Sequence, residues 1–100
     1  MSVAVVIQSP VWDFARRLAP GSRRAIKRAL RELQSERGDI RSLEGRLSRY
    51  HRLRGGKYRI IFRYADPGTI EAIFAEERGI VYEVFEAEFL SRLKGGTTAG

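Results

Sequence analysis

A Gly-Gly pair at positions 55 and 56 separates two stretches that alternate as β-strands do. Glycine at such a junction favours a tight hairpin turn, because hairpin turns often need a positive φ. The first predicted strand is 50–54. The second places its aromatic and apolar side chains on one face, which we expect to be the core face: Tyr58, Ile60, Phe62 and Tyr64.

Two helices are predicted before this hairpin, after a β-branched strand at 3–7. Ser9 is expected to cap the first helix, since Pro10 suits the first helical position. Ser22 is expected to cap the second, which should end near Gly38. The expected apolar positions of the two helices are Trp12, Phe14, Ala15 and Leu18 in the first, and Ile26, Ala29, Leu30 and Leu33 in the second.

After the hairpin, Asp66-Pro67-Gly68 predicts a turn, and 69–75 a third strand of the same meander. The apolar period then changes from two to about 3.6, which predicts a final amphipathic helix. Its expected apolar positions begin at Val81 and end at Leu93. The stretch 39–48 is interpreted as a connector without a strand.

The predicted order is strand, two helices, three strands and helix, which indicates an α+β fold. We expect a four-stranded, mostly antiparallel sheet with the N-terminal helical hairpin on one face and a C-terminal helix. The apolar first strand should pair beside the meander. One domain is predicted over residues 1–94, followed by a flexible tail at 95–100.

Positive charge is concentrated in the hairpin. Seven Arg and Lys residues and no carboxylate lie between Glu44 and Asp66, and the net charge of the whole chain is +7. Like charges on neighbouring strands repel each other unless an anion neutralises them. The sequence therefore predicts a polyanionic partner, such as RNA or an acidic protein segment.

Several other site classes are not supported. The chain has no cysteine, one histidine and no cluster of aspartates, so neither a metal site nor another cofactor is expected. Its N-terminus lacks the basic segment of a signal peptide, and no apolar run approaches a membrane span. We expect a soluble cytoplasmic protein.

Two motifs carry a family resemblance. "SLEGRLSRYHRLRGGKYRIIFRY", followed by "IFAEERGIVYEVF", resembles the RelE/ParE superfamily of toxins from type II toxin–antitoxin systems, and is nearer to RelE than to ParE. RelE-like members are metal-independent endoribonucleases that cleave messenger RNA in the ribosomal A site and so inhibit translation. ParE-like members share the scaffold but inhibit DNA gyrase. An acidic segment of a cognate antitoxin neutralises either kind in a hetero-oligomeric complex.

The resemblance implies a site on one sheet face. Arg59, Arg78 and Tyr82 would be the catalytic residues. Cleavage through the 2′-hydroxyl needs stabilisation of the charged phosphorane, and a guanidinium does this well but transfers protons poorly. The residues expected to bind RNA phosphates are Arg52, Arg54, Lys57 and Arg63, although a solvated surface role remains open for each, and for Lys57 especially. Tyr82 would stack on a base or orient the hydroxyl, or else belong to the core.

The sequence leaves the general acid and base open. Glu76 and Glu77 stand where many RelE-like relatives have basic residues, so either one serves as a base or both form surface ion pairs. His51 is expected to be a partly buried structural residue. Three functions therefore remain open: a ribosome-dependent nuclease, a gyrase inhibitor, and a degenerate toxin that only binds its partner.

Overall fold

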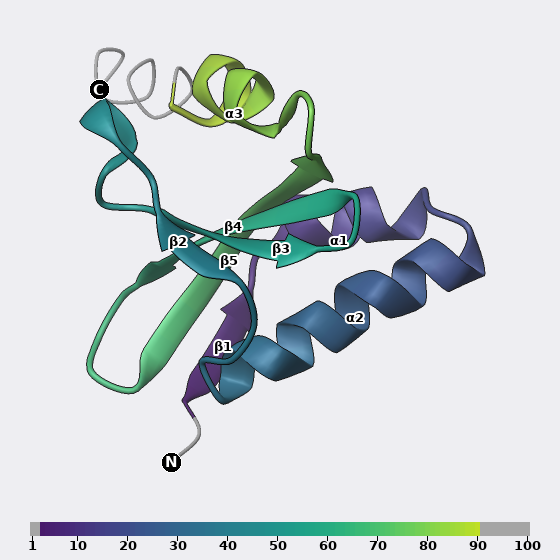
Figure 1. Cartoon of the computed structure of the whole chain (residues 1–100), viewed down its shortest axis with the longest axis horizontal. Helices are drawn as coiled ribbons and strands as arrows, with labels where there is room; N and C mark the ends of the chain where they lie inside the picture. Colours follow the sequence, from purple (N-terminus) through teal and green to yellow (C-terminus); the bar gives the residue numbers. More distant parts are fainter. Residues whose placement is uncertain (1–2, 91–100) are drawn as a thin grey trace.

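The computed structural model describes residues 3–90 and shows a five-stranded sheet with helices on both faces (Figure 1). The strands are β1 (Ala4–Ile7), β2 (Ile40–Ser42), β3 (His51–Gly55), β4 (Tyr58–Tyr64) and β5 (Thr69–Glu77). Their order across the sheet is β1-β5-β4-β3-β2. The α+β class is confirmed. So is the pairing of the first strand beside the meander, where β1 runs parallel to β5.

The strand count differs from the predicted four. Residues 40–42, interpreted as connector, form β2 and pair antiparallel with the edge of β3. A strand of three residues is too short to show an alternation in sequence. Residues 40–42 form a strand only because the neighbouring β3 supplies their hydrogen-bond partners.

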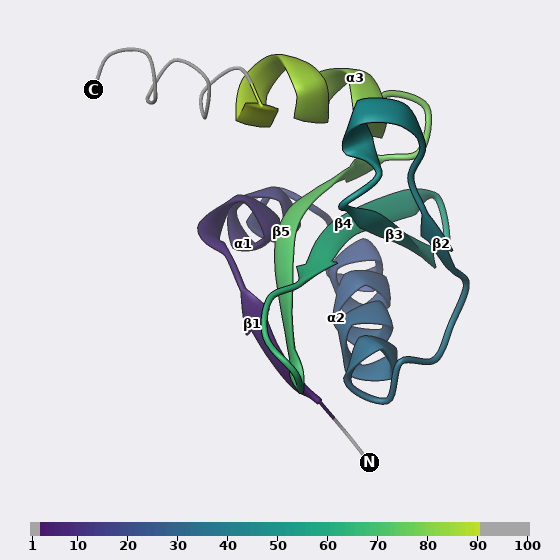
Figure 2. The ribbon, with the colours of Figure 1, turned by 90° about the vertical axis from the view of Figure 1, so that its left-hand side faces the viewer.

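The helical hairpin consists of α1 (Ser9–Arg16) and α2 (Pro20–Gln34), which cover one face of the sheet (Figure 2). α1 packs on β5 and α2 on β3. Neither predicted serine cap forms: Gln8 and Ala19 precede the helices, with no side-chain cap bond. α2 also ends before Gly38, because Glu36 already has a positive φ of 52°.

The core between the hairpin and the sheet contains all the predicted apolar residues of α2. In α1, Val11 is fully buried, whereas the predicted core residue Trp12 is 37% exposed. Tyr58, Ile60 and Phe62 are buried as predicted, but Tyr64 is 46% exposed. Its strand runs past the end of α2, and its hydroxyl donates to Glu36 Oε1 over 3.0 Å.

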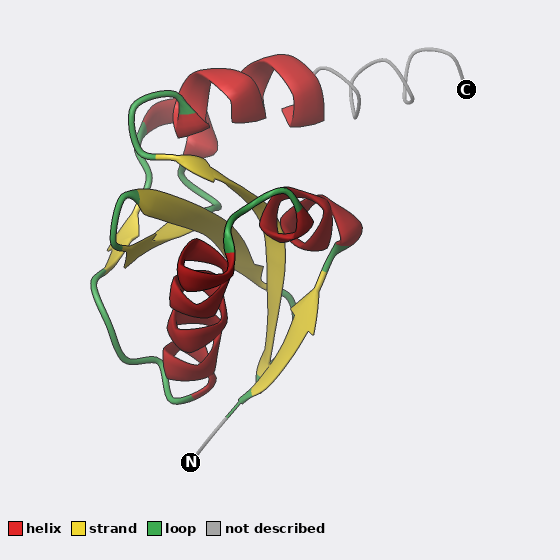
Figure 3. Ribbon diagram, turned by 90° about the vertical axis from the view of Figure 1, so that its right-hand side faces the viewer, coloured by secondary structure: helices red, strands yellow, loops and turns green. Residues whose placement is uncertain are grey.

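A second core lies on the opposite sheet face, beneath the C-terminal helix (Figure 3). This helix comprises α3 (Val81–Val84) and a π-helical segment (Phe85–Leu90). Phe85 is fully buried, and its ring centroid lies 5.1 Å from that of Tyr50 and 5.6 Å from that of Phe74. The predicted position Leu93 and the tail at 95–100 lie outside the described residues.

A β-bulge lets β5 contribute two consecutive side chains to this second core. The register on β4 shifts between Ile61 and Phe62, which pair with Phe74 and Ala72, so Ile73 has no partner on β4. The bulge turns the consecutive side chains of Ile73 and Phe74 to the same face, where both are buried. The face that carries the basic residues is thereby anchored to the C-terminal helix.

Candidate nucleic-acid interface

Three arginines lie together on the sheet face that the C-terminal helix partly covers. Arg54 on β3 is directly opposite Arg59 on β4, and Arg52 is opposite Ile61 of the second core. Directly opposed side chains on antiparallel strands have Cβ atoms roughly 5 Å apart. The sequence prediction that these strands gather Arg52, Arg54 and Arg59 on one face therefore agrees with the strand register.

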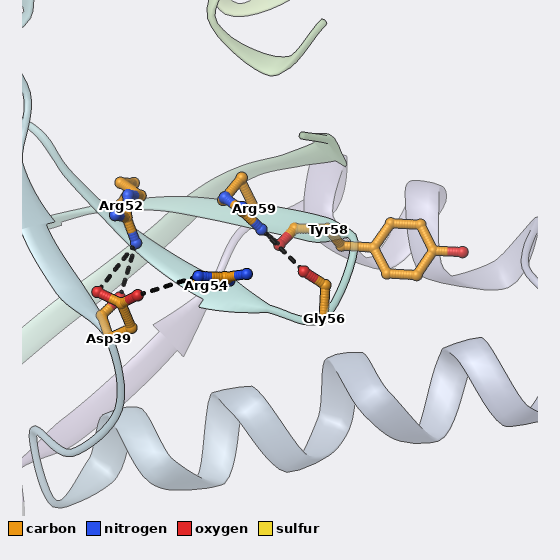
Figure 4. A network of polar contacts seen from close by, with 6 residues as sticks. All are labelled: Asp39, Arg52, Arg54, Gly56, Tyr58 and Arg59. Carbon is orange, nitrogen blue, oxygen red and sulfur yellow. Dashed lines mark hydrogen bonds and ion pairs between the residues drawn. The ribbon is translucent and has the colours of Figure 1, made fainter. Parts of the chain in front are cut away.

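The Gly-Gly turn fixes the geometry of the Arg54–Arg59 pair. Gly56 has a φ of 62°, which the turn requires. Gly55 ends β3 against α2, where an added Cβ would lie 3.2 Å from the Cβ of Ala29. The Arg59 side chain folds back over the turn, and its Nη1 donates to the carbonyl oxygens of Gly56 and Tyr58, each over 2.9 Å (Figure 4).

Arg59 is partly buried and lies directly opposite another arginine, Arg54. Burial lowers the pKa of its guanidinium, and the positive charges of Arg54, Arg52 and Arg78 lower this pKa further, while Tyr82 acts in the opposite direction. The guanidinium remains charged at any physiological pH. Burial is the main cause of the shift, and the neighbouring positive charges add to it, so a bound anion would relieve their part.

Asp39 is a part of the site that the sequence did not reveal. Its carboxylate oxygens lie 3.3 Å from Arg52 Nη1 and 3.7 Å from Arg54 Nη1 (Figure 4). The interpretation that no acid neutralises these arginines is therefore wrong. Asp39 lies outside the acid-free window and in a stretch read as connector. Only the pairing of β2 with β3 brings it beside them.

Arg78 and Tyr82 approach the same place from the end of β5. The backbone N–H of Arg78 donates to the carbonyl oxygen of Lys57 over 2.9 Å, which ties this segment to the β3–β4 turn. Tyr82 is 36% exposed at the beginning of α3 and is absent from the second core, although Val81 beside it belongs there. The backbone bond therefore places Arg78 beside the turn that precedes Arg59, and the charge of Arg78 lowers the pKa of Arg59 while Tyr82 raises it.

Lys57 and Arg63 lie at the margins. Lys57 is in the turn, with its ammonium 5.5 Å from the centre of the Tyr58 ring. Arg63 is four residues beyond Arg59 on β4, roughly 13 Å along the strand. It pairs with Glu71 at 2.6 Å, beside a hollow of about 410 Å³ that is also lined by Arg49. The structure therefore separates Arg63 from the cluster around Arg59.

The two carboxylates at the end of β5 face opposite ways. Glu76 is directly opposite Arg59, whereas Glu77 is opposite Tyr58 of the other core. No ion pair joins Glu76 to Arg59 among the described residues; Glu76 Oε1 instead accepts from the backbone N–H of Glu77 over 3.1 Å. Glu76 is thus the carboxylate on the arginine face, while Glu77 is not.

His51 is partly buried, as expected, and lies on the face that the helical hairpin covers. Its ring stacks on Phe62 at 5.4 Å between centroids and meets the edge of Tyr64. Ser42 Oγ is 3.2 Å from its Nδ1. Burial lowers the pKa of this imidazole. These contacts give His51 a packing role at the sheet edge, separate from the arginine cluster.

Residues 3–90 contain no group of three or more His, Cys, Asp or Glu side chains placed to hold a metal ion. Over the same residues no helix has the length and hydropathy needed to cross a membrane.

Sequence comparison finds no matching family model and no matching curated protein. Solved structures do match the fold. The RelBE2 toxin–antitoxin complex of Mycobacterium tuberculosis superposes with a TM-score of 0.67 at 21% identity, over 78% of this chain and 93% of that one. The archaeal RelE–RelB complex of Pyrococcus horikoshii OT3 gives 0.63 at 24% identity, over 79% and 98%.

A third match is described as a YoeB/ParE toxin from Agrobacterium tumefaciens, with a TM-score of 0.61 at 20% identity, over 75% of this chain and 98% of that one. The three matched structures carry the names of both branches of the superfamily. Since these identities are all below one quarter, the likeness concerns the fold. The chain therefore has the fold of the RelE/ParE toxins, with an arginine cluster on the face beneath its C-terminal helix.

Proposed function

We propose that this protein is the toxin of a type II toxin–antitoxin pair and acts in the cytoplasm as a RelE-like endoribonuclease on ribosome-bound messenger RNA. The observation that carries the proposal is the environment of Arg59. It lies within the positive field of Arg52, Arg54 and Arg78, with Tyr82 beside the cluster, on a fold shared with RelE toxins. Such a cluster suits a phosphate whose charge increases in the transition state.

The chemistry would be attack by a ribose 2′-hydroxyl on the adjacent phosphorus. The O2′–P bond forms and the P–O5′ bond breaks, which leaves a cyclic phosphate and a free 5′-hydroxyl. All hydrogen bonds that the structure gives Arg59 within the described residues use Nη1, so Nη2 and Nε are left for the phosphorane oxygens. Arg78, whose backbone is bonded to the turn at Lys57, would share this role.

Proton transfer needs other groups, because an arginine holds its proton too tightly. Glu76 is directly opposite Arg59 on β5 and would take the proton from the 2′-hydroxyl. Tyr82, exposed at the beginning of α3, would orient the hydroxyl or stack on the neighbouring base. Water would protonate the leaving 5′-oxygen. The proposed mechanism uses no metal.

The proposed inhibitor is a cognate antitoxin. Two of the structures that share this fold are toxins bound to their antitoxins. An acidic segment of the partner would neutralise the arginine face and exclude RNA from it. Because charge attraction between exposed groups is screened by salt, the affinity for the antitoxin should fall as ionic strength rises.

The test uses a purified translation system with a defined messenger, whose ends are mapped by primer extension with and without ribosomes. The expected result is ribosome-dependent cleavage at A-site codons. Arg59→Gln should slow cleavage by about 100-fold or more, the loss typical when one donor to a transition-state anion is removed. The control is Arg24→Gln, the same change at an exposed position of α2 on the other side of the sheet, which should cleave normally. Equal cleavage by both variants would contradict the assignment of Arg59.

A second candidate is gyrase inhibition. It is favoured by the pairing of Arg52 and Arg54 with Asp39, which suits a surface that binds protein, and by the match to a structure described as YoeB/ParE. An intact messenger with normal protein synthesis, together with arrested DNA supercoiling by gyrase, would establish this candidate instead.

A further inference from the structure

Asp39 binds the arginine cluster through two groups at once. Its carboxylate contacts Arg52 and Arg54 at 3.3 Å and 3.7 Å. Its backbone carbonyl oxygen accepts from Arg52 Nη1 over 3.0 Å and from the backbone N–H of Arg54 over 3.1 Å. A single residue, fixed where the chain enters β2, thus places a negative charge between two arginines of the proposed RNA site.

The two arginines are held to very different degrees. The Arg52 side chain is only 13% exposed and is bound by both the carboxylate and the carbonyl of Asp39. The Arg54 side chain is 51% exposed, and its guanidinium makes one long contact of 3.7 Å. An ion pair this exposed and this long contributes little, so Arg54 can leave Asp39 readily while Arg52 cannot.

The position of Arg54 explains why a counter-charge is needed when no RNA is bound. Arg54 is directly opposite Arg59, and like charges on opposed strand positions repel each other. The carboxylate of Asp39 offsets part of that repulsion. A phosphate that arrives between Arg54 and Arg59 would offset it better, because it would contact both.

We propose that Asp39 is an internal counter-anion that RNA displaces from Arg54. In the free protein it occupies the anion position beside Arg52 and Arg54. On binding, Arg54 exchanges Asp39 for a phosphate, while Arg52 keeps Asp39 in place. This inference rests on the RNA-cleaving function proposed above and adds its regulation. Asp39 lowers the affinity of the arginine site for polyanions.

The test compares two variants that lose the same charge. Asp39→Asn keeps the shape of the side chain and the backbone carbonyl. Asp66→Asn makes the same change in the exposed β4–β5 turn, at the far end of β4 from Arg59. Each variant, and the unaltered protein, is titrated into a labelled 2′-O-methyl RNA oligomer, which cannot be cleaved, and binding is followed by fluorescence anisotropy over a series of salt concentrations.

Asp39→Asn should bind several-fold more tightly at low salt. Its plot of log affinity against log salt should keep the slope of the unaltered protein, because Arg54 contacts a phosphate in both complexes. Asp66→Asn should bind RNA as the unaltered protein does. In an Arg54→Gln background, Asp39→Asn should no longer tighten binding.

A second measurement does not depend on any variant folding. In the unaltered protein, the guanidinium NMR signals of Arg54 and Arg59 should shift on titration with the same RNA, while those of Arg52 stay in place. Two results would overturn the counter-anion role while RNA binding itself stands. One is that Asp39→Asn binds RNA no more tightly than Asp66→Asn does. The other is that the NMR signals of Arg52 shift together with those of Arg54. If the unaltered protein binds no RNA at all and cleaves none on ribosomes, the proposed function fails and this inference fails with it.

Discussion

The close contact between Gly55 and α2 makes a sharp test of how the arginine face is positioned. Gly55 is buried at the end of β3, and an added Cβ would lie 3.2 Å from the Cβ of Ala29. Optimal contacts between carbon atoms are about 3.5–4.0 Å. Gly55 is not among the glycines with a positive φ, so Gly55→Ala would test packing without adding backbone strain.

We expect Gly55→Ala to lower the free energy of unfolding by about 1–3 kcal/mol, because overpacking a dense core forces the backbone to move. Ala29 is 5% exposed on α2, so it has little room to retreat. Ala29→Gly alone should cost about 1 kcal/mol through helix propensity. The double variant should be more stable than the sum of the two costs implies, since each change makes room for the other.

Urea denaturation followed by circular dichroism measures all three free energies. The control is Gly21→Ala, since a Cβ at Gly21 meets nothing within 4 Å, and this variant should be neutral or slightly stabilised. Gly55→Ala with unchanged stability, or a double variant whose cost is simply additive, would refute the argument that this contact fixes the end of β3. Because β3 carries Arg54, we also expect the single variant to cleave RNA more slowly than the double variant.

Two further predictions concern His51 and the C-terminal helix. Burial lowers the pKa of the His51 imidazole from 6.5. As the pH falls, the imidazole therefore becomes protonated in the unfolded chain before it does in the folded protein. The free energy of unfolding should decrease as the pH falls through 6.5, and it should level off below the folded-state pKa. His51→Gln should remove that part of the pH dependence in urea titrations, and an identical profile would contradict it. Phe85→Ala removes a fully buried ring between Tyr50 and Phe74, so docking of the C-terminal helix should weaken by about 3–5 kcal/mol. Faster amide exchange at residues 81–88, together with loss of cleavage, would show that the helix docks more weakly. Unchanged amide exchange would contradict this prediction.

The alternation around the Gly-Gly pair was enough to predict β3, β4 and their shared arginine face. A period of two assigns each side chain to a face, and the short turn leaves little freedom of register. The spacing of Ile26, Ala29, Leu30 and Leu33 likewise predicted the buried side of α2. Helix boundaries were less well predicted, because caps depend on individual backbone angles such as the positive φ of Glu36.

The sequence predicted the arginines of the candidate site but not its carboxylate, Asp39. Sequence spacing placed Arg52, Arg54 and Arg59 together, since all three belong to one hairpin. Asp39 reaches them only because β2 pairs with the outer edge of β3, and a strand of three residues leaves no periodic signal. The exposure of Tyr64 was missed for a similar reason, since periodicity gives its face but not where the covering helix ends.

The sequence by itself determined most of the local structure: the three predicted helices, every strand except β2, the face that most side chains take, and the excess of positive charge on the hairpin. These follow from periodicity and turn chemistry, which act over a few residues. The tertiary structure alone decided how that charge is balanced. The approach of Asp39 to Arg52 and Arg54, and of Arg78 and Tyr82 to Arg59, depends on pairing and packing between segments distant in the chain, where electrostatic effects follow distance in space and not position in sequence.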